Sequence, residues 1–262
     1  MSNALDQFYT KPEVASLCFD TVKHREYDLW IEPSAGTGNF YNLLPVDKRA
    51  GLDLEPRHDE VQKKDFFEWK IPNGNHIAIG NPPFGYRAQG AIAFFNHAAK
   101  FCSTIAFIVP RSFRKAYIIN QLHPNFHVSK EIILDLGIFD GGAEKIRTVW
   151  QVWDRQKHKR EKIVLPSKHE DFKIVSQGQN FNPDEADLAI RRTGYRNVGE
   201  IVFPEVATPI TQYVFIKVIN EDAIEILEDL NLDCAFDTAL SPTVTQGEII
   251  QAYIDRKRKN SS

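Results

Sequence analysis

The chain is poor in cysteine and has no long apolar segment. Its three cysteines, Cys18, Cys102 and Cys234, lie far apart and form no Cys-x-x-Cys pair. This spacing argues against a zinc site and favours a reducing, cytoplasmic environment. No apolar run approaches the roughly 18 residues that a membrane-spanning helix needs, and the N-terminus lacks the apolar region of a signal peptide. We therefore expect no bound metal and no membrane association.

Two common nucleotide-binding motifs are also missing, although a related turn is present. An apolar stretch leads into Glu32-Pro33-Ser34-Ala35-Gly36-Thr37-Gly38. Small residues in such a turn let a ligand approach the backbone and its free N–H groups. Position 41 is Tyr, so the dinucleotide pattern Gly-x-Gly-x-x-Gly is not formed, and no Gly-Lys-Ser/Thr of a P-loop follows.

Asn81-Pro82-Pro83-Phe84 is the most informative segment of the chain. It follows the apolar run His76–Gly80, which predicts a short buried strand. The two prolines lack N–H groups and restrict φ, so the turn is stiff and can direct Asn81 and the Pro82 carbonyl toward a planar amino group. Phe84 offers a ring on which a base could stack. An ordinary proline turn followed by a core Phe is the alternative interpretation.

Acidic residues follow two further predicted strands. Asp53, in Gly51-Leu52-Asp53, lies where an acidic side chain accepts hydrogen bonds from ribose hydroxyls in doubly wound folds, and Glu55 is the second choice. Asp65 ends a third predicted strand and could accept a hydrogen bond from an adenine amino group. Each carboxylate taken alone could equally be a helix cap or a solvated loop charge.

In this order, the segments resemble the S-adenosylmethionine-dependent N6-adenine methyltransferases. The resemblance extends to about Arg155 and also includes Phe8-Tyr9-Thr10-Lys11-Pro12. It implies S-adenosylmethionine as the cofactor and Asn81, Pro82, Pro83 and Phe84 as the catalytic residues. The implied cofactor-binding residues are Tyr9, Thr10, Glu32, Ser34, Ala35, Gly36, Gly38, Asp53, Asp65, Phe66 and Asn81.

The order of the motifs, with the cofactor segments before the tetrapeptide, resembles the gamma arrangement of DNA amino-methyltransferases. The resemblance implies methyl transfer to the N6 amine of adenine in nucleic acid, with DNA favoured, as in restriction-modification systems. A nuclease or an accessory subunit would then be a partner, and the oligomeric state stays open. No Cys follows a Pro in the chain, which argues against methylation of cytosine C5.

Several alternatives remain open, because other acceptors also present a planar amino group. They are an adenine of RNA, the guanine N2 amine of ribosomal RNA and the side-chain amide of a protein glutamine. A non-catalytic subunit that uses a methyltransferase-like fold for binding is a further alternative.

Positive charge is not in excess, since 32 Lys and Arg face 35 Asp and Glu and the net charge is −3. A protein that binds nucleic acid must then gather its positive charge locally. Two clusters alternate arginines with the aromatic residues Phe113, Tyr117 and Tyr195, the mixture expected where phosphates and bases are held. The candidate nucleic-acid-binding residues are Arg111, Arg114, Lys115, Arg191, Arg192 and Arg196.

The alternation of strands and helices predicts an α/β fold with a Rossmann-like, mostly parallel methyltransferase sheet. The predicted parallel strands are Leu29–Ile31, Ala50–Leu54, Lys64–Phe66, His76–Ile79 and Thr104–Val109, and the helices are Glu13–Val22 and Ala88–Phe101. The segments Glu131–Leu136 and Thr148–Trp153 would form an antiparallel pair at one edge. We expect the cofactor-binding catalytic domain to span residues 1–162.

Residues 163–262 are expected to form a small α+β region that contacts the substrate. Its predicted strands are Ile163–Leu165, Phe172–Val175, Ala186–Gly194 and Gln212–Val218, and its helices are Ala223–Leu230 and Gln246–Ile254. A Thr245-x-x-Glu248 capping box would begin the last helix. The basic run Arg256–Lys259 is expected to be a disordered tail.

Overall fold

The chain folds as two compact units, residues 1–162 and 163–262, and the computed structural model describes residues 8–71, 73–141, 144–175 and 181–260. The first unit contains a seven-stranded sheet. In chain order its strands are β2 (Leu29–Glu32), β3 (Arg49–Asp53), β4 (Gln62–Lys63), β5 (His76–Gly80), β6 (Thr104–Pro110), β7 (Phe126–Ile133) and β9 (Thr148–Arg155).

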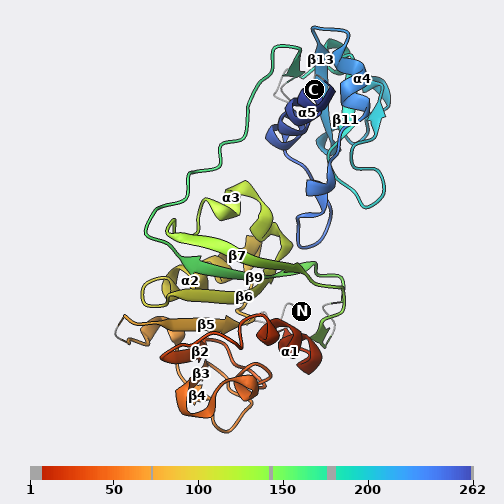
Figure 1. Cartoon of the computed structure of the whole chain (residues 1–262). Helices are drawn as coiled ribbons and strands as arrows, with labels where there is room; N and C mark the ends of the chain where they lie inside the picture. Colours follow the sequence, from red (N-terminus) through yellow and green to blue (C-terminus); the bar gives the residue numbers. More distant parts are fainter. Residues whose placement is uncertain (1–7, 72, 142–143, 176–180, 261–262) are drawn as a thin grey trace. The chain divides into compact units, whose positions relative to one another are not determined.

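The spatial order of these strands is β4-β3-β2-β5-β6-β9-β7 (Figure 1). The five strands from β4 to β6 are parallel to one another, whereas β9 runs antiparallel to both β6 and β7. In this arrangement β2, the first parallel strand of the chain, lies in the middle of the five parallel strands, as in doubly wound folds. The predicted Rossmann-like methyltransferase fold with an antiparallel pair at one edge is therefore confirmed.

Three helices and a small two-stranded sheet accompany the main sheet. The helices are α1 (Pro12–Asp20), α2 (Gln89–Ala98) and α3 (Ala116–Ile119). Strand β1 (Tyr9–Thr10) pairs in antiparallel fashion with β8 (Phe139–Asp140), which fixes the start of the chain beside a loop from much later in the sequence. Pro12 begins α1, where its missing N–H costs nothing because the first helical N–H groups have no intrahelical partner.

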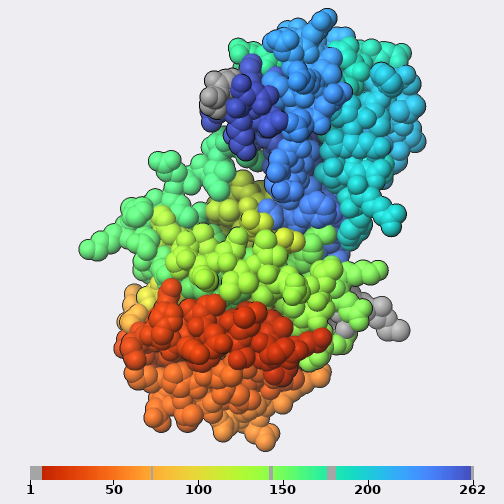
Figure 2. All heavy atoms as spheres, turned by 45° about the vertical axis from the view of Figure 1, so that its right-hand side comes forward, coloured from red at the N-terminus to blue at the C-terminus, as the bar shows by residue number. Residues whose placement is uncertain are grey.

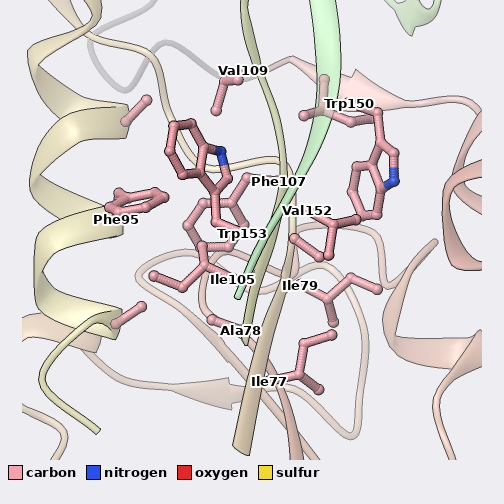
Figure 3. Packing of buried hydrophobic residues seen from close by; sticks show 14 of the residues in the cluster. Ile77, Ala78, Ile79, Phe95, Ile105, Phe107, Val109, Trp150, Val152 and Trp153 are labelled. Atoms are coloured by element: carbon pink, nitrogen blue, oxygen red, sulfur yellow. The ribbon is translucent and has the colours of Figure 1, made fainter. Parts of the chain in front are cut away.

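The core lies on both faces of β6 and β9. All seven residues of β6 are buried, as expected for a strand covered on two sides. Trp150 and Trp153 lie three positions apart on β9 and so point to opposite faces (Figure 3). Trp153 packs edge-on against Phe95 of α2, with ring centres 5.5 Å apart. Trp150 stacks on Phe40 at 5.9 Å.

The predicted element boundaries were wrong at several places in the first unit. The third strand is Gln62–Lys63 instead of Lys64–Phe66, because the Asp65 side chain accepts from the Phe67 N–H and begins a short 3₁₀ helix there. Strand β7 begins at Phe126, five residues before the predicted start, since its whole length pairs with β9.

The second unit is a four-stranded antiparallel sheet with two helices. The strands are β10 (Phe172–Val175), β11 (Leu188–Arg191), β12 (Ile201–Val202) and β13 (Tyr213–Val218), and the helices are α4 (Ala223–Glu228) and α5 (Gln246–Asn260). The sheet order is β10-β13-β11-β12. Helix α5 lies at the surface of this unit (Figure 2), while its buried residues Ile249, Ile250 and Tyr253 join the core. Within the described part of the chain, no helix combines the length and the apolar content that crossing a membrane requires.

The predicted strand Phe172–Val175 and both helices are present in this unit, but two other predictions were wrong. Ile163–Leu165 forms no strand. The basic run at the end is not a disordered tail, because it forms the last part of α5, where Lys257 pairs with Asp171 and Arg256 pairs with Asp229. The capping box is present, since the Glu248 N–H donates to Thr245 Oγ1 at 3.3 Å and the Glu248 carboxylate accepts from the Thr245 N–H at 2.8 Å.

The buried carboxylate of Asp171, the residue before β10, accepts hydrogen bonds from two side chains of α5. Asp171 Oδ2 accepts from Tyr253 Oη at 2.5 Å and from Lys257 Nζ at 2.6 Å. Burial alone would raise the pKa of Asp171, but the hydrogen bonds from Lys257 and Tyr253 outweigh it and hold the pKa below its usual value. Asp171 therefore contributes stability as long as it is charged.

Acidification should weaken the second unit through this carboxylate. A lowered pKa in the folded state gives a contribution that is complete above the unfolded pKa, about 3.9, and is lost as the pH falls through the folded value. We expect Asp171→Asn to lower the melting temperature at neutral pH and to flatten its decrease below about pH 4, measured by circular dichroism of the full chain. Asp187→Asn, which breaks an exposed pair with Lys217, is the control and should have a smaller effect. Equal effects of the two variants would contradict the prediction.

Candidate active site

A cavity of about 300 Å³ lies where the parallel strands β2, β3 and β5 end. The chain leaves β2 toward β3 on one side and returns to β5 on the other, and ligands of doubly wound sheets bind at such a reversal. Twelve of the predicted site residues line this cavity. They are Tyr9, Thr10, Glu32, Ser34, Ala35, Gly36, Asp53, Asp65, Phe66, Asn81, Pro82 and Pro83.

The glycine turn after β2 is shaped by its backbone conformation. Gly36 and Gly38 have φ of +49° and +81°, which residues with a Cβ rarely adopt. A Cβ on Gly36 would also lie 2.9 Å from the Tyr9 ring. Gly38 donates its N–H to the Ala35 carbonyl at 2.7 Å and is not part of the cavity lining formed by the described residues. Its role is therefore to shape the turn.

Asp53, at the end of β3, accepts a hydrogen bond from the backbone of the glycine turn. Its Oδ2 accepts from the Gly36 N–H at 2.7 Å, and its Oδ1 accepts from the Glu55 N–H at 2.8 Å. Each carboxylate oxygen has a second lone pair, so Asp53 can accept further hydrogen bonds from a ligand in the cavity. Glu55 is exposed and lies outside the cavity lining, which favours Asp53 as the ligand-binding acid.

Glu32 is a buried carboxylate at the end of β2. Burial raises its pKa well above the usual value, and the nearby charge of Asp53 raises it further, although a backbone hydrogen bond from Tyr41 opposes the shift. Glu32 Oε2 has no hydrogen-bond partner among the described residues. An unpartnered buried carboxylate oxygen is costly, so a donor from a cationic ligand group would stabilise it.

Asn81 lines the cavity and is held through its amide nitrogen, while its side-chain oxygen has no partner among the described residues. The Nδ2 group donates to the Phe8 carbonyl at 2.7 Å, and the Asn81 carbonyl accepts from Ser34 Oγ at 3.1 Å. Asn81 Oδ1 is buried and has no partner in the described part of the structure. The side chain is thus fixed through its amide nitrogen and keeps one acceptor for a ligand.

Phe84 does not present its ring to the cavity. It is 5% exposed, and its ring packs against Phe8 and Phe139 with centres 6.0 and 6.1 Å apart. The position of this ring agrees with the alternative interpretation of a core Phe. The other three residues of the tetrapeptide line the cavity.

Aromatic side chains line the cavity beside Asp65. Phe66 is buried and stacks on Phe94 of α2 at 5.4 Å, while Phe67 is 43% exposed and meets Phe94 edge-on at 4.9 Å. Phe67 and Phe94 both line the cavity, and the sequence analysis named neither as a site residue. Phe67 could have been found as the neighbour of Phe66, whereas nothing in the sequence connects Phe94 with the cavity.

Seven further lining residues were also missed. Most of them lie within or next to the predicted motifs, so including each whole motif and one or two further positions would have found them. They are Phe8, Pro33, Thr37, Asn39, Phe40, Leu54 and Lys64.

The arginine cluster of the first unit is partly used within the fold. Arg114 Nε lies 3.0 Å from Glu131 Oε1, and the Arg111 N–H donates to the Arg147 carbonyl. Lys115 is only 4% exposed, so it is a poor candidate for contact with a phosphate. Phe113 is fully buried in the core and cannot stack with a base, unlike the half-exposed Tyr117.

In the arginine cluster of the second unit, some guanidinium groups are bonded within the fold and others can contact a ligand. The Arg191 guanidinium donates to the Thr193 carbonyl, Tyr213 Oη and Gln212 Oε1. Arg192 is half-buried and Arg196 is exposed. Of this cluster, Arg192 and Arg196 are therefore the residues suited to bind phosphate. Across the described residues, no group of three or more His, Cys, Asp and Glu side chains could hold a metal ion.

No family model matches the chain. A type II methyltransferase, M.CvrRI, of Paramecium bursaria Chlorella virus XZ-6E is 25% identical over 96 residues, a match that covers 32% of this chain and 25% of that protein. The aligned segment thus spans only a quarter of the relative. The sheet order and the cavity at the carboxyl ends of the strands are those of a Rossmann-like methyltransferase fold, and this match supports an S-adenosylmethionine-dependent methyltransferase.

Solved structures similar to this chain include one described as a methyltransferase and one described as a subunit of a restriction enzyme. One is a candidate RNA methyltransferase of Pyrococcus horikoshii, with 18% identity and a TM-score of 0.46, covering 58% of this chain and 88% of that one. Another is the modification subunit of a candidate type I restriction enzyme of Vibrio vulnificus, with 14% identity and a TM-score of 0.45, covering 69% of this chain and 49% of that one.

Proposed function

We propose that this protein transfers a methyl group from S-adenosylmethionine to the exocyclic N6 amine of adenine in nucleic acid, with DNA as the favoured acceptor. The observation that carries the proposal is the buried, unpartnered Oδ1 of Asn81, in a stiff Asn-Pro-Pro turn at the edge of the cavity. An acceptor atom fixed there suits a planar amino group. The sequence match to a type II methyltransferase supports methyl transfer as the reaction.

The residues of the cavity fit the cofactor. The orphaned Glu32 Oε2 suits the ammonium group of its methionine part, and Ser34, Ala35 and Gly36 of the glycine turn line the same cavity. Asp53 would accept from the ribose hydroxyls. Asp65 would accept from the adenine amino group. When bound, S-adenosylmethionine supplies an electrophilic methyl group on a sulfonium.

The tetrapeptide would act on the acceptor amine mainly by alignment. The lone pair of an exocyclic amine is delocalised into the ring, so the amine is a poor nucleophile. Acceptance of its two N–H bonds by Asn81 Oδ1 and the Pro82 carbonyl would favour a pyramidal nitrogen and point its lone pair toward the methyl group. Such positioning can lower a barrier by several kcal/mol. The amine nitrogen would gain the methyl group that the sulfonium loses, and the proton of the amine would leave to water.

The target adenine of a duplex would have to leave the base stack to reach Asn81. Extrusion of a base costs a few kcal/mol and less in a single strand. We therefore expect faster methylation of single-stranded or mismatched substrates whenever binding is not limiting.

The experiment that tests the function uses methyl-labelled S-adenosylmethionine with separate pools of DNA, RNA and protein. Nucleoside and peptide mass analysis then identifies the methylated group. N6-methyladenine in the DNA pool supports the proposal. Label only in RNA, at guanine N2 or on a glutamine amide would assign the site to one of the alternatives, and no turnover with intact cofactor binding would indicate a binding subunit.

Nucleic-acid binding should depend steeply on salt in spite of the net charge of −3. If Arg111, Arg114, Arg192 and Arg196 contact about four phosphates, the log-log slope on duplex DNA is near −4, at about 0.9 per phosphate. Because Arg191 is bonded within its unit, the test variant reverses Arg192 and Arg196 to Glu. It should flatten the slope by about 2 and weaken binding at least tenfold at low salt.

The control for this variant is Lys173→Glu, at an exposed position of the edge strand β10. It changes the net charge in the same direction but should leave the slope almost unchanged. Binding that is insensitive to salt, or an equal effect of the control, would show that Arg192 and Arg196 do not contact phosphate.

A further inference from the structure

The turn that follows the tetrapeptide has an unusual backbone. Gly85, Arg87 and Ala88 have φ of +67°, +51° and +64°. Residues with a Cβ seldom adopt this left-handed conformation, and it persists only where the surroundings fix it. Such strain at the rim of a cavity is a reason to ask what the turn does.

The surroundings do fix this turn at both ends. Phe84 before it and Ala88 after it are both buried in the core. The Ala88 N–H donates to the Gly85 carbonyl, and the Ala91 N–H donates to the Phe84 carbonyl, both at 3.2 Å. A Cβ on Gly85 would lie 2.8 Å from the backbone nitrogen of Gly90, so the turn closes tightly onto the start of α2. Tyr86 and Arg87, which lie between Gly85 and Ala88, are therefore displayed on a rigid support.

Those two residues are an aromatic and a cation, and both face solvent. The Tyr86 side chain is 77% exposed, and the Arg87 guanidinium carbon lies 5.1 Å from the centre of the Tyr86 ring. Leaving a large ring in water forgoes the gain from burying it. An exposed ring beside a guanidinium is the combination on which bases stack while a phosphate is neutralised.

The location of the pair matches a nucleic-acid strand that enters the cavity. Tyr86 follows Pro83 of the cavity lining by three residues but is not itself part of the lining. Arg114 and Tyr117 follow β6, the parallel neighbour of β5, and so come after the same edge of the sheet as Tyr86. Gln89 at the start of α2 is linked through Gln121 to the Tyr117 carbonyl, with bonds of 3.4 and 2.8 Å.

We propose that Tyr86 and Arg87 hold the nucleotide next to the acceptor adenine, with its base stacked on the Tyr86 ring and its phosphate at Arg87. The inference rests on the proposed function and adds the residues that hold the strand outside the cavity. The acceptor base itself must reach Asn81, whereas Tyr86 lies beyond the cavity lining, so the ring is available to a flanking base.

The test compares two fluorescent probes, a short oligodeoxyadenylate and an abasic strand of the same length. Tyr86→Ala should weaken binding of the oligodeoxyadenylate by roughly 5- to 150-fold, the loss of one stacked base. It should leave the affinity for the abasic strand unchanged, because that probe keeps the phosphates but has no base. Tyr86→Phe retains the ring and should bind both probes like the unmodified protein.

Arg87→Asn tests the phosphate contact without adding backbone strain, because Asn tolerates positive φ. It should weaken binding of both probes and reduce the log-log salt slope by about 0.7 on a single strand. In methylation assays Tyr86→Ala should raise KM for the oligonucleotide and leave kcat at saturation within a few-fold.

The outcomes separate this inference from the proposed function. If the unmodified protein methylates DNA and Tyr86→Ala binds oligodeoxyadenylate normally, or if both probes are lost equally, the role of Tyr86 is refuted while the function stands. If the unmodified protein binds neither probe and labels only protein, both proposals fail.

Discussion

Asn81→Ala should reduce the rate of methyl transfer by on the order of 10²–10³, or about 2.7–4 kcal/mol, the loss typical of a hydrogen bond formed in the transition state. The reason is that Asn81 Oδ1 is a buried acceptor without a partner, fixed through the bond from Nδ2 to the Phe8 carbonyl. Affinity for the cofactor, measured by calorimetry, should stay within a few-fold, because the atom is assigned to the acceptor amine. Single-turnover kinetics at saturating cofactor measures the chemical step.

The control must separate the missing acceptor atom from a loosened N-terminal segment, since Asn81→Ala also removes the bond to Phe8. Asn39→Ala is suited to this purpose, because Asn39 Nδ2 donates to the neighbouring Thr10 carbonyl at the same distance of 2.7 Å. We expect a few-fold effect on the rate for this variant. An equal loss in both variants would indicate a structural role for Asn81, and near-full activity of Asn81→Ala would refute its assignment to the acceptor.

Asp53→Ala should weaken cofactor binding more than it changes the rate at saturating cofactor. Hydrogen bonds to a charged group contribute about 1.5–3 kcal/mol each, so the loss of even one ribose contact should raise Kd at least tenfold. The same carboxylate also holds the N–H groups of Gly36 and Glu55, at 2.7 and 2.8 Å, so its removal should loosen the glycine turn as well. Both effects raise the free energy of the bound ground state and of the transition state by similar amounts. The affinity for the cofactor should therefore change more than the rate at saturating cofactor.

Asp28→Ala is the matched control, because Asp28 also accepts from a backbone N–H, that of Asn75, but lies outside the cavity lining. Its cofactor affinity should equal that of the unmodified protein. Unchanged affinity of Asp53→Ala would contradict the ribose assignment and direct attention to Glu55. Asp53→Asn adds detail, since an amide can accept from only one of the two N–H groups and should give an intermediate affinity.

The structure also changes where a nucleic-acid strand is expected to lie. Lys115 is buried, Arg114 pairs with Glu131 and Arg191 is bonded within its own unit, so three of the six predicted contact residues are engaged in the fold. Tyr86 and Arg87, which the charge pattern alone did not single out, are exposed beside the tetrapeptide. Variants of the exposed residues are therefore more informative than variants of the complete clusters.

The sequence by itself determined the sheet and most of the cavity. Strands such as Thr104–Pro110 were predictable because a continuous apolar run of this length is typical of a strand buried on both faces. The glycine turn and the Asn-Pro-Pro turn were predictable because small residues and prolines restrict the backbone locally. Twelve of the predicted residues met at one cavity because parallel strands bring their carboxyl ends to one edge.

Only the tertiary structure decided which of these side chains face the cavity and which are buried. Phe84 belongs to the core, and Phe94 reaches the cavity from α2, because ring packing depends on segments far apart in the sequence. Likewise, Lys257 is part of a helix because Asp171, 86 residues earlier, binds it. Local pattern fixes strands and turns, whereas burial, charge pairing and the direction of a side chain depend on neighbours that only the folded chain brings together.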